Sequence, residues 1–293
     1  MHPPIPPSEV RDAYVTGSQM IVVGISGQRL LVVRSVDAGG TWSQVALPAG
    51  SGDAGSAGLV VAGGTVVGIS VIDQSSAQFS TGEWYATKDR GKTWVHNRAP
   101  AGGQGSATPG YVWIAPVGGT PRAVVYRSAD SGANWTAIAL PGGVIALGAP
   151  QALSDGRIVL VGSDSAHPGS STVYMSGDAQ NFKVLSTVSV AHASSSVAAD
   201  TVWLAPPDGS QVVRVSAKGQ ATSATSHGFP TSPNAAGVAT GPNALKIYAY
   251  SDVAGWADVL LSSCASGKSS CSERHAIFRT LNGGKSWNTL VPS

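Results

Sequence analysis

The sequence contains few charged residues, and this scarcity limits the classes of partner that we expect. Lys, Arg, Asp and Glu together make up 12% of the 293 residues, whereas globular proteins average roughly 25%. The net charge is only +2, and no basic run or basic strip interleaved with aromatic residues occurs. We therefore expect neither nucleic acid nor an anionic membrane as a partner.

Long apolar runs and cofactor fingerprints are also missing. Nowhere do 18 apolar residues follow one another, which argues against a transmembrane helix. The six His residues are scattered without a His-x-x-x-His pair, and no nucleophile elbow, P-loop or dinucleotide fingerprint occurs. We predict no bound metal and no cofactor.

Only two cysteines occur, Cys264 and Cys271, on either side of a short Ser/Gly-rich segment. Such a spacing can close into a disulfide-stapled loop, which would fit an oxidising compartment. Two free thiols in a loop are the alternative. The start, Met1 to Pro7, has a polyproline-like composition, which would suit a chain cut after an export signal. We expect a secreted or cell-envelope protein with a leader over residues 1–10 and a single domain over residues 11–293.

A repeat runs through the whole chain. Each copy begins with an apolar segment and continues to a second apolar or aromatic segment that leads into a polar turn. The first segments start at residues 21, 66, 111, 158, 201 and 246, a spacing close to 45. Val, Ile and Tyr predominate in both segments, as in strands, and no helical periodicity is sustained. A period in the forties with about four strand-sized segments predicts an all-β fold, a six-bladed β-propeller of four-stranded antiparallel blades. A seven-bladed ring is the alternative.

The closing turns share a pattern of hydroxyl, carboxylate, glycine and aromatic residue. Two copies are complete, Ser35 to Trp42 and Thr87 to Trp94, and Ser128 to Trp135 is close to them. The other copies depart from the pattern. The structural residues that we assign to the turns are Asp37, Trp42, Asp89, Trp94, Asp130, Trp135, Asp178, Asn282 and Trp287.

These turns resemble the Asp-box, or BNR, repeats of sialidases, sortilin-like receptors, xyloglucanases and photosystem-assembly factors. The resemblance covers roughly residues 20 to 290 and implies a sialidase-like propeller. Because a short carboxylate can accept bonds from backbone N–H groups a few residues on, we interpret the Asp residues as turn-fixing rather than catalytic. The Gly can adopt positive φ, and the Trp can bury a large area between sheets.

The resemblance implies a ligand face opposite these turns, an analogy from fold alone. Four carboxylates follow segments that we interpret as second strands and therefore point to that face: Asp73, Asp164, Asp208 and Asp252. His167 joins them, and we expect a long last loop to contribute Trp256 and Asp258. Turn initiation by Asp, and a local core for Trp256, are the alternative interpretations.

The candidates for catalysis follow from the same resemblance. Sialidases open with an Arg-Ile-Pro motif, which is absent here, although Tyr248 and Tyr250 lie near where a nucleophile would be expected. A different glycoside hydrolase would need two carboxyl groups about 5 to 10 Å apart. The candidates for catalysis are Asp73, Asp164, Asp252 and Tyr250; those for ligand binding are Trp256, His167, Asp208 and Asp258.

Three functions follow from these observations. We favour a monomeric binding module for a carbohydrate or protein ligand, because no catalytic constellation is visible. A glycoside hydrolase with paired Asp carboxylates is the first alternative, and an assembly or scaffold factor is the second.

Overall fold

The computed structural model describes residues 3–50, 53–73, 81–117, 124–141, 144–164, 167–191, 193–229, 242–264 and 271–291. Strands dominate these residues, and the only helical element among them is a short 3-10 helix, η1 (Pro7–Glu9). No helix in this part of the chain is long and apolar enough to cross a membrane. The predicted all-β class is confirmed.

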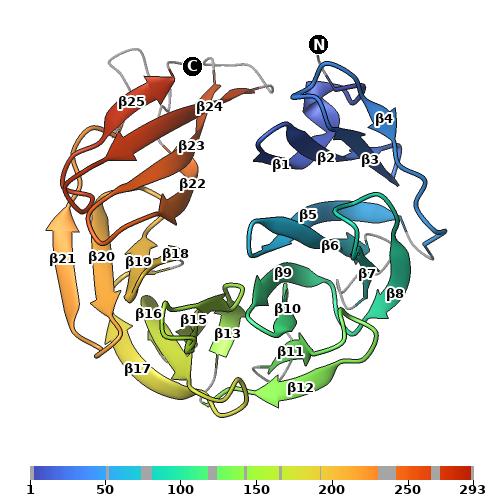
Figure 1. Cartoon of the computed structure of the whole chain (residues 1–293). Coiled ribbons are helices and arrows are strands. Elements are labelled where there is room, and N and C mark those ends of the chain that lie inside the picture. Colours follow the sequence, from blue (N-terminus) through green and yellow to red (C-terminus); the bar gives the residue numbers. More distant parts are fainter. Residues whose placement is uncertain are drawn as a thin grey trace. The chain divides into compact units, whose positions relative to one another are not determined.

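The strands form six antiparallel sheets, which we number in chain order (Figure 1). Sheet 1 contains β1 (Val10–Thr16), β2 (Gln19–Ser26), β3 (Arg29–Ser35) and β4 (Ser43–Gln44). Sheet 2 contains β5 (Ala54–Ala62), β6 (Thr65–Asp73), β7 (Gly82–Ala86) and β8 (Val95–Ala99). Sheet 3 contains β9 (Gly103–Thr108), β10 (Tyr111–Pro116), β11 (Val124–Ser128) and β12 (Thr136–Ala139).

The last three sheets repeat this order with one additional strand. Sheet 4 contains β13 (Val144–Leu147), β15 (Ile158–Asp164), β16 (His167–Ser176) and β17 (Lys183–Val188), with β14 (Gln151–Ala152) also paired to β15. Sheet 5 contains β18 (Ser194–Ala198), β19 (Thr201–Ala205), β20 (Gln211–Ser216) and β21 (Ala221–Thr225). Sheet 6 contains β22 (Pro242–Ala249), β23 (Gly255–Cys264), β24 (Cys271–Thr280) and β25 (Asn288–Val291).

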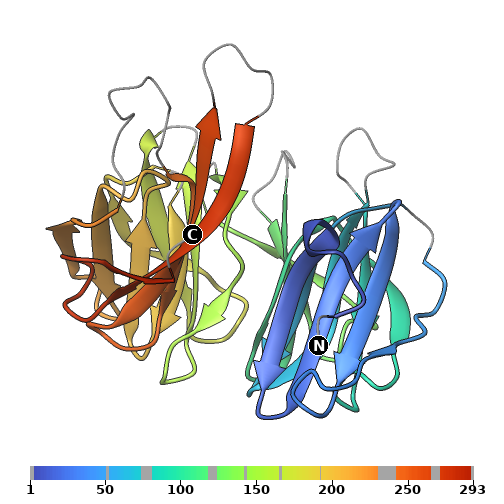
Figure 2. The ribbon, with the colours of Figure 1, turned by 90° about the horizontal axis from the view of Figure 1, so that it is seen from above.

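The six sheets are the blades of a six-bladed β-propeller, as the sequence predicts, and the seven-bladed alternative is wrong. The chain divides into two compact units, Met1–Pro150 and Gln151–Ser293. The first unit contains sheets 1 to 3, and strands β14 to β25 belong to the second. In Figure 2 the blue strands of the first unit stand side by side, with turns at both of their ends.

Large apolar side chains are buried where successive sheets of a unit pack together. In the first unit, Trp84 of β7 is 0% exposed and packs with Val112 and Ile114 of sheet 3. In the second unit, Trp203 of β19 is equally buried, in a cluster with Phe278 of sheet 6. Strand alternation explains this arrangement, because every second side chain of a strand points to the same face.

The repeat misplaces the last blade. The segment that starts at Lys246 belongs to β22, the first strand of sheet 6, although the spacing predicts a second strand there. The N–H groups of Tyr250 and Ser251 both donate to the carbonyl of Ala254, at 3.1 Å each. This tight turn sends the chain back as β23, so the stretch expected to be a loop is largely strand.

The proline-rich start is attached to the first sheet. Ile5 is 2% exposed and belongs to a cluster with Val22 and Val33. A Cβ added to Gly24 would lie 2.7 Å from a methyl group of Ile5, so the close packing requires glycine there. The single domain over residues 11–293 stays a prediction.

Candidate ligand-binding site

Six similar turns join the third and fourth strands of the sheets. In the turn after β3, the Ser35 hydroxyl donates to Asp37 Oδ1 at 2.7 Å and accepts from the Gly39 N–H at 2.9 Å. Asp37 Oδ1 also accepts from the Thr41 N–H at 2.8 Å. The carboxylate thus holds backbone donors of its own turn, as its spacing predicts.

These hydrogen bonds lower the pKa values of the exposed turn carboxylates. The Thr41 N–H lowers the pKa of Asp37 to about 2, and the Thr93 N–H lowers the pKa of Asp89 to about 2. The Ser128 hydroxyl is the largest cause lowering the pKa of Asp130 to about 2. The Asn181 N–H lowers the pKa of Asp178 further. A general acid needs a raised pKa, so these four groups are suited to fixing turns.

In four of the six turns a glycine lets the preceding sheet approach closely: Gly91, Gly132, Gly219 and Gly284. Gly132, at φ +90°, lies so near the Trp84 indole that an added Cβ would be 2.2 Å from it. Trp84 Nε1 donates to the carbonyl of Ser131 at 2.8 Å, and Trp135 meets the same indole edge-on. Trp94 and Trp287 are buried, whereas Trp42 and Trp135 are half-buried. The turns therefore seal the contacts between neighbouring sheets.

The residues that follow second strands are held locally. Asp73 ends β6 and accepts from the Thr81 hydroxyl at 3.2 Å. Asp208 is exposed and accepts from the Ser210 N–H at 3.0 Å, so it caps its own turn. His167 begins β16 and pairs with Asp164 in register; the side chain of Asp164 lies outside the described residues.

Asp252 lies at the opposite edge from the one that the repeat predicts. It is in the turn between β22 and β23, and the neighbouring Val253 carbonyl accepts from the N–H of Gly283, a residue of the sixth turn. Asp252 Oδ1 accepts from the Thr201 hydroxyl at 3.0 Å. Since the sixth segment is a first strand, its far end points to the edge that carries the turns. The placement of Asp252 with Asp73 and Asp208 is wrong.

Trp256 and Asp258 are strand residues, not residues of a long loop. Both belong to β23, where Trp256 pairs with Tyr248 of β22 and Asp258 pairs with Lys246. The Trp256 and Tyr248 rings are stacked, with centroids 4.0 Å apart and planes at 12°. One face of the indole is therefore covered by tyrosine.

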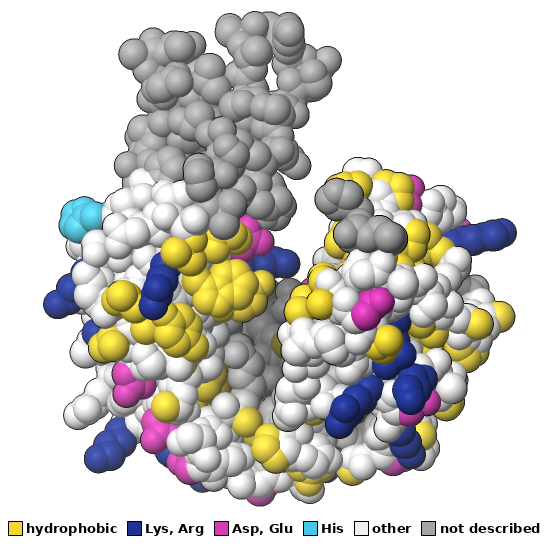
Figure 3. Space-filling model, turned by 45° about the horizontal axis from the view of Figure 1, so that its top comes forward, with side chains coloured by type: hydrophobic (Ala, Val, Ile, Leu, Met, Phe, Trp, Pro, Cys, Tyr) yellow, Lys and Arg dark blue, Asp and Glu magenta, His cyan; other side chains and the backbone are white. Residues whose placement is uncertain are grey.

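An aromatic row crosses sheet 6 at this point. We define it as Tyr248, Trp256 and Arg279, which are successive partners across β22, β23 and β24, together with Tyr250. Arg279 Nε donates to the Tyr250 hydroxyl at 3.3 Å. Tyr248 and Tyr250 are 38% and 54% exposed. Figure 3 shows hydrophobic side chains gathered beside basic ones on the second unit.

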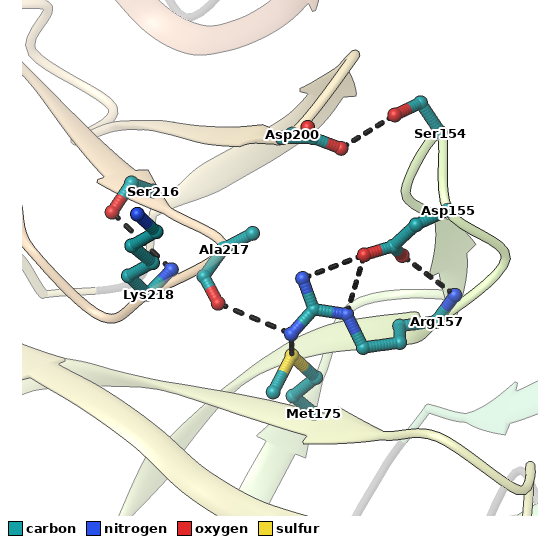
Figure 4. Close-up of polar contacts among 8 residues, drawn as sticks. All are labelled: Ser154, Asp155, Arg157, Met175, Asp200, Ser216, Ala217 and Lys218. Carbon is teal, nitrogen blue, oxygen red and sulfur yellow. Dashed lines mark hydrogen bonds and ion pairs between the residues drawn. The ribbon is translucent and has the colours of Figure 1, made fainter.

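The side chains of Arg157 and Arg214 are engaged by neighbouring residues. The Arg157 guanidinium forms an ion pair with Asp155 at 2.7 Å and donates to the Ala217 carbonyl at 3.3 Å (Figure 4). Arg214 donates to the Asp252 carbonyl at 2.8 Å. Both tie neighbouring sheets together at the edge that carries the turns.

The two cysteines face each other in the strand register. Cys264 ends β23, Cys271 begins β24, and the two are paired as backbone partners. Their side chains lie outside the described residues, so the disulfide stays a prediction.

The side chains that are described offer recognition more readily than catalysis. Asp208 and Asp252 lie at opposite edges of sheets 5 and 6, so the structure does not bring these two carboxylates together. No group of three or more His, Cys, Asp or Glu residues that could hold a metal occurs in the described ranges. The aromatic row combines exposed rings with a guanidinium, which is typical of binding surfaces.

Several solved structures have a similar fold. YCF48 from Cyanidioschyzon merolae aligns with a TM-score of 0.55 and 15% identity, over 96% of this chain and 84% of that one. YCF48 bound to D1 peptide aligns with a TM-score of 0.53 and 16% identity, over 97% and 82%.

Two enzymes also align. The GH74 xyloglucanase from Xanthomonas campestris gives a TM-score of 0.61 and 14% identity, over 97% of this chain but 45% of that one. A catalytically inactive virginiamycin B lyase from Staphylococcus aureus with quinupristin aligns with a TM-score of 0.57 and 11% identity, over 94% of this chain and 92% of that one. No family model matches the sequence, and no curated protein matches it. Identities this low establish the fold alone, and that fold is the β-propeller.

Proposed function

We propose that this propeller is a binding module that recognises a protein segment through the aromatic row of sheet 6. The observation that carries the proposal is the stacked pair of Tyr248 and Trp256 beside the exposed Tyr250 and the Arg279 guanidinium. Tyr, Trp and Arg are the side chains enriched where proteins bind each other most tightly.

The stacking geometry favours a protein segment over a sugar. A sugar ring that stacks on Trp256 would need an open indole face, and Tyr248 covers one of them at 4.0 Å. The row combines three aromatic rings, two of them with phenol hydroxyls, and one guanidinium. Apolar and polar groups of a peptide can use all of these. A structure of YCF48 with the same fold is bound to D1 peptide, which supports a role as an assembly or scaffold factor.

Glycoside hydrolysis has less support. It requires two carboxyl groups about 5 to 10 Å apart, and the described carboxylates of Asp208 and Asp252 lie at opposite edges of sheets 5 and 6. We therefore keep a glycan as an outcome of the binding test and do not propose a hydrolase.

The wider classification belongs to the same proposal. We propose that the six turns are Asp boxes of the sialidase-like superfamily, a view supported by the hydroxyl and carboxylate hydrogen bonds at Asp37, Asp89 and Asp130. Export to an oxidising compartment is supported by the backbone pairing of Cys264 with Cys271. A monomer is the state that we expect.

Parallel selections on the whole chain test the binding proposal. A random peptide library and a glycan array are each probed with the wild-type chain, with Trp256→Ala and with Leu281→Ala. Leu281 is 61% exposed in the same unit but outside the aromatic row, so it is a matched control. We expect peptides that bind the wild type and Leu281→Ala at least about tenfold more tightly than Trp256→Ala, the scale of a hot-spot residue.

Two outcomes would contradict the proposal. Peptide binding that survives both Trp256→Ala and Arg279→Ala would place recognition elsewhere on the chain. The second outcome is that glycans bind, peptides do not, and Trp256→Ala abolishes glycan binding. The aromatic row would then be the binding surface, but its ligand would be a glycan.

A further inference from the structure

A groove with two basic side chains lies between sheets 1 and 2, at the edge that carries the turns. It belongs wholly to the first unit and has a volume of about 520 Å³. The end of β3, the strand β4 and the second turn line it. They contribute the polar side chains of Arg34, Ser43, Gln44, Lys92 and Thr93 and the indole of Trp94. The segment 45–48 forms the apolar part of the wall.

The positive charge in this groove is not balanced by its lining. None of the residues that line it is acidic, and neither Arg34 nor Lys92 forms an ion pair with a described carboxylate. The carboxylate of Asp89, in the same turn as Lys92, is committed to that turn. It accepts from the N–H groups of Lys92 and Thr93 at 3.0 and 2.9 Å and from the Thr93 hydroxyl at 2.7 Å.

Arg34 has a donor that lacks an acceptor. Its Nε is buried, and no described group accepts a hydrogen bond from it. A buried donor without an acceptor is destabilising, and an anion seated against the guanidinium would offset this loss. Arg127 precedes the third turn as Arg34 precedes the first, but its guanidinium lies 4.6 Å over the Tyr111 ring. Arg214 precedes the fifth turn and also has a buried Nε without an acceptor, but its Nη1 donates to the Asp252 carbonyl at 2.8 Å.

The wall determines what kind of anion fits. Val45 and Leu47 are half-buried and pack against the core of sheets 1 and 2, and Trp94 is 6% exposed at the groove. A small hydrated ion would leave this apolar surface unused. The planar fork of arginine binds a carboxylate in a bidentate manner, while the hydroxyl of Ser43 and the amide of Gln44 can bond to a neighbouring amide.

We propose that the groove binds a carboxylate carried by an apolar body, the chemistry of a polypeptide C-terminus with an apolar last side chain. Arg34 receives the carboxylate, Lys92 adds a second positive charge, and the apolar body lies along segment 45–48. This site is independent of the aromatic row, because it uses other residues in the other unit.

Three small ligands and nuclear magnetic resonance of the whole chain test the proposal. N-acetylphenylalanine mimics a peptide end, its amide removes only the charge, and 3-phenylpropanoate retains the carboxylate but removes the acetamido group. We expect N-acetylphenylalanine to shift the Trp94 indole signal and the amides of residues 43–48, and its amide to bind about tenfold more weakly or worse. If 3-phenylpropanoate binds as well as N-acetylphenylalanine, a small free acid is the source, whereas weaker binding would assign a peptide end. Both results support the carboxylate site.

Variants locate the charge. Arg34→Gln should weaken N-acetylphenylalanine binding about tenfold or more, with Arg34→Lys between it and the wild type because the fork is lost. Lys92→Gln should weaken binding by a smaller factor. Lys88→Gln should leave it unchanged, since Lys88 is an exposed lysine of the same turn that does not line the groove. If Arg34→Gln does not fold, the affinities of Lys92→Gln and Lys88→Gln for N-acetylphenylalanine still test whether the basic side chains of the groove bind the carboxylate.

The proposal fails on any of three results. Equal affinity for N-acetylphenylalanine and its amide would show that the carboxylate charge does not contribute to binding. Signal shifts confined to residues outside the groove would place the ligand elsewhere. Equal affinity in Lys92→Gln and Lys88→Gln, with Arg34→Lys indistinguishable from the wild type, would show that the basic side chains do not contribute.

Discussion

The turns of the two units differ in the residue that lies two positions after the Ser or Thr hydroxyl. The first unit has a carboxylate in each of its three turns, Asp37, Asp89 and Asp130. In the second unit only Asp178 remains, Lys218 replaces the carboxylate in sheet 5, and Asn282 replaces it in sheet 6.

The hydroxyl, by contrast, is present in all six turns. Each accepts the N–H two residues on, at 3.3 to 3.4 Å. In five of the six turns it also accepts the N–H four residues on, at 2.8 to 3.2 Å. The comparison teaches that the hydroxyl is the common structural element of the turn and that the carboxylate is replaceable.

The largest expected effect concerns the tryptophans between the sheets. Trp84→Ala and Trp203→Ala should each lower the free energy of unfolding by about 3–5 kcal/mol, since both indoles are 0% exposed. Trp84→Phe should cost about 1 kcal/mol more than Trp203→Phe. The reason is that Trp84 Nε1 donates to Ser131, whereas Trp203 Nε1 has no hydrogen-bond partner among the described residues. Urea unfolding of the four variants measures the difference, and equal losses in the two Phe variants would break this contrast between units.

A hydroxyl should matter more than the carboxylate beside it. Ser128→Ala leaves the N–H of Gly132 without its acceptor at 2.8 Å in a buried position, so we expect a loss of about 1–3 kcal/mol. Asp130→Asn should cost less, because Asn282 already occupies this position in sheet 6 and accepts from the Ser286 N–H at 3.0 Å. The two variants are compared by thermal and urea unfolding. A greater loss in Asp130→Asn would make the carboxylate the essential element.

Acid should loosen the turns of the first unit before those of sheets 5 and 6. The folded pKa values of Asp37, Asp89 and Asp130 are about 2, below the ordinary 3.8. A lowered folded pKa contributes stability that is present above 3.8 and is lost as the pH falls from there to about 2. Hydrogen exchange measured at pH 6, 4 and 3 should show protection falling first around these three turns. Uniform loss across all six turns would contradict the comparison.

Backbone strain gives the smallest effect. The residue after the carboxylate has positive φ in four turns and is not glycine in any of them, as in Ala38 at φ +57°, whereas sheet 6 has Gly283 at φ +73°. Gly283→Ala should destabilise by about 1 kcal/mol or more, since its Cβ would also lie 2.7 Å from the Arg214 guanidinium. Ala38→Gly should be neutral or slightly stabilising. Thermal unfolding distinguishes the two, and a destabilising Ala38→Gly would refute the strain.

The sequence predicts the fold well because the turn motif is local. Hydroxyl, carboxylate and glycine lie within five residues, so their hydrogen bonds need no tertiary information. The prediction for the last blade is wrong because a spacing, unlike the turn motif, contains no information about strand order. The spacing of 45 to Lys246 continues the rhythm by coincidence, and the tight turn at Tyr250 that makes β22 a first strand has no distinctive sequence signal.

Recognition surfaces depend on contacts that the sequence does not reveal. The sequence indicates Tyr250 and Trp256 separately as candidate site residues. The stacking of Trp256 on Tyr248 follows only from the strand register. Arg34 and Lys92 are far apart in the chain and meet only because neighbouring sheets pack face to face. No local sequence signal marks the groove, since lysines also occur in the fifth and sixth turns, at Lys218 and Lys285.

The central claim is that the turn carboxylates serve the fold and not catalysis. Titration of the side-chain carboxyl signals of Asp37, Asp89 and Asp130 by nuclear magnetic resonance measures this directly. We predict a pKa of about 2 for each, because backbone N–H groups and hydroxyls bond to the ionised form. Values at or above the ordinary 3.8 would mean that these bonds are absent in solution and would contradict the claim.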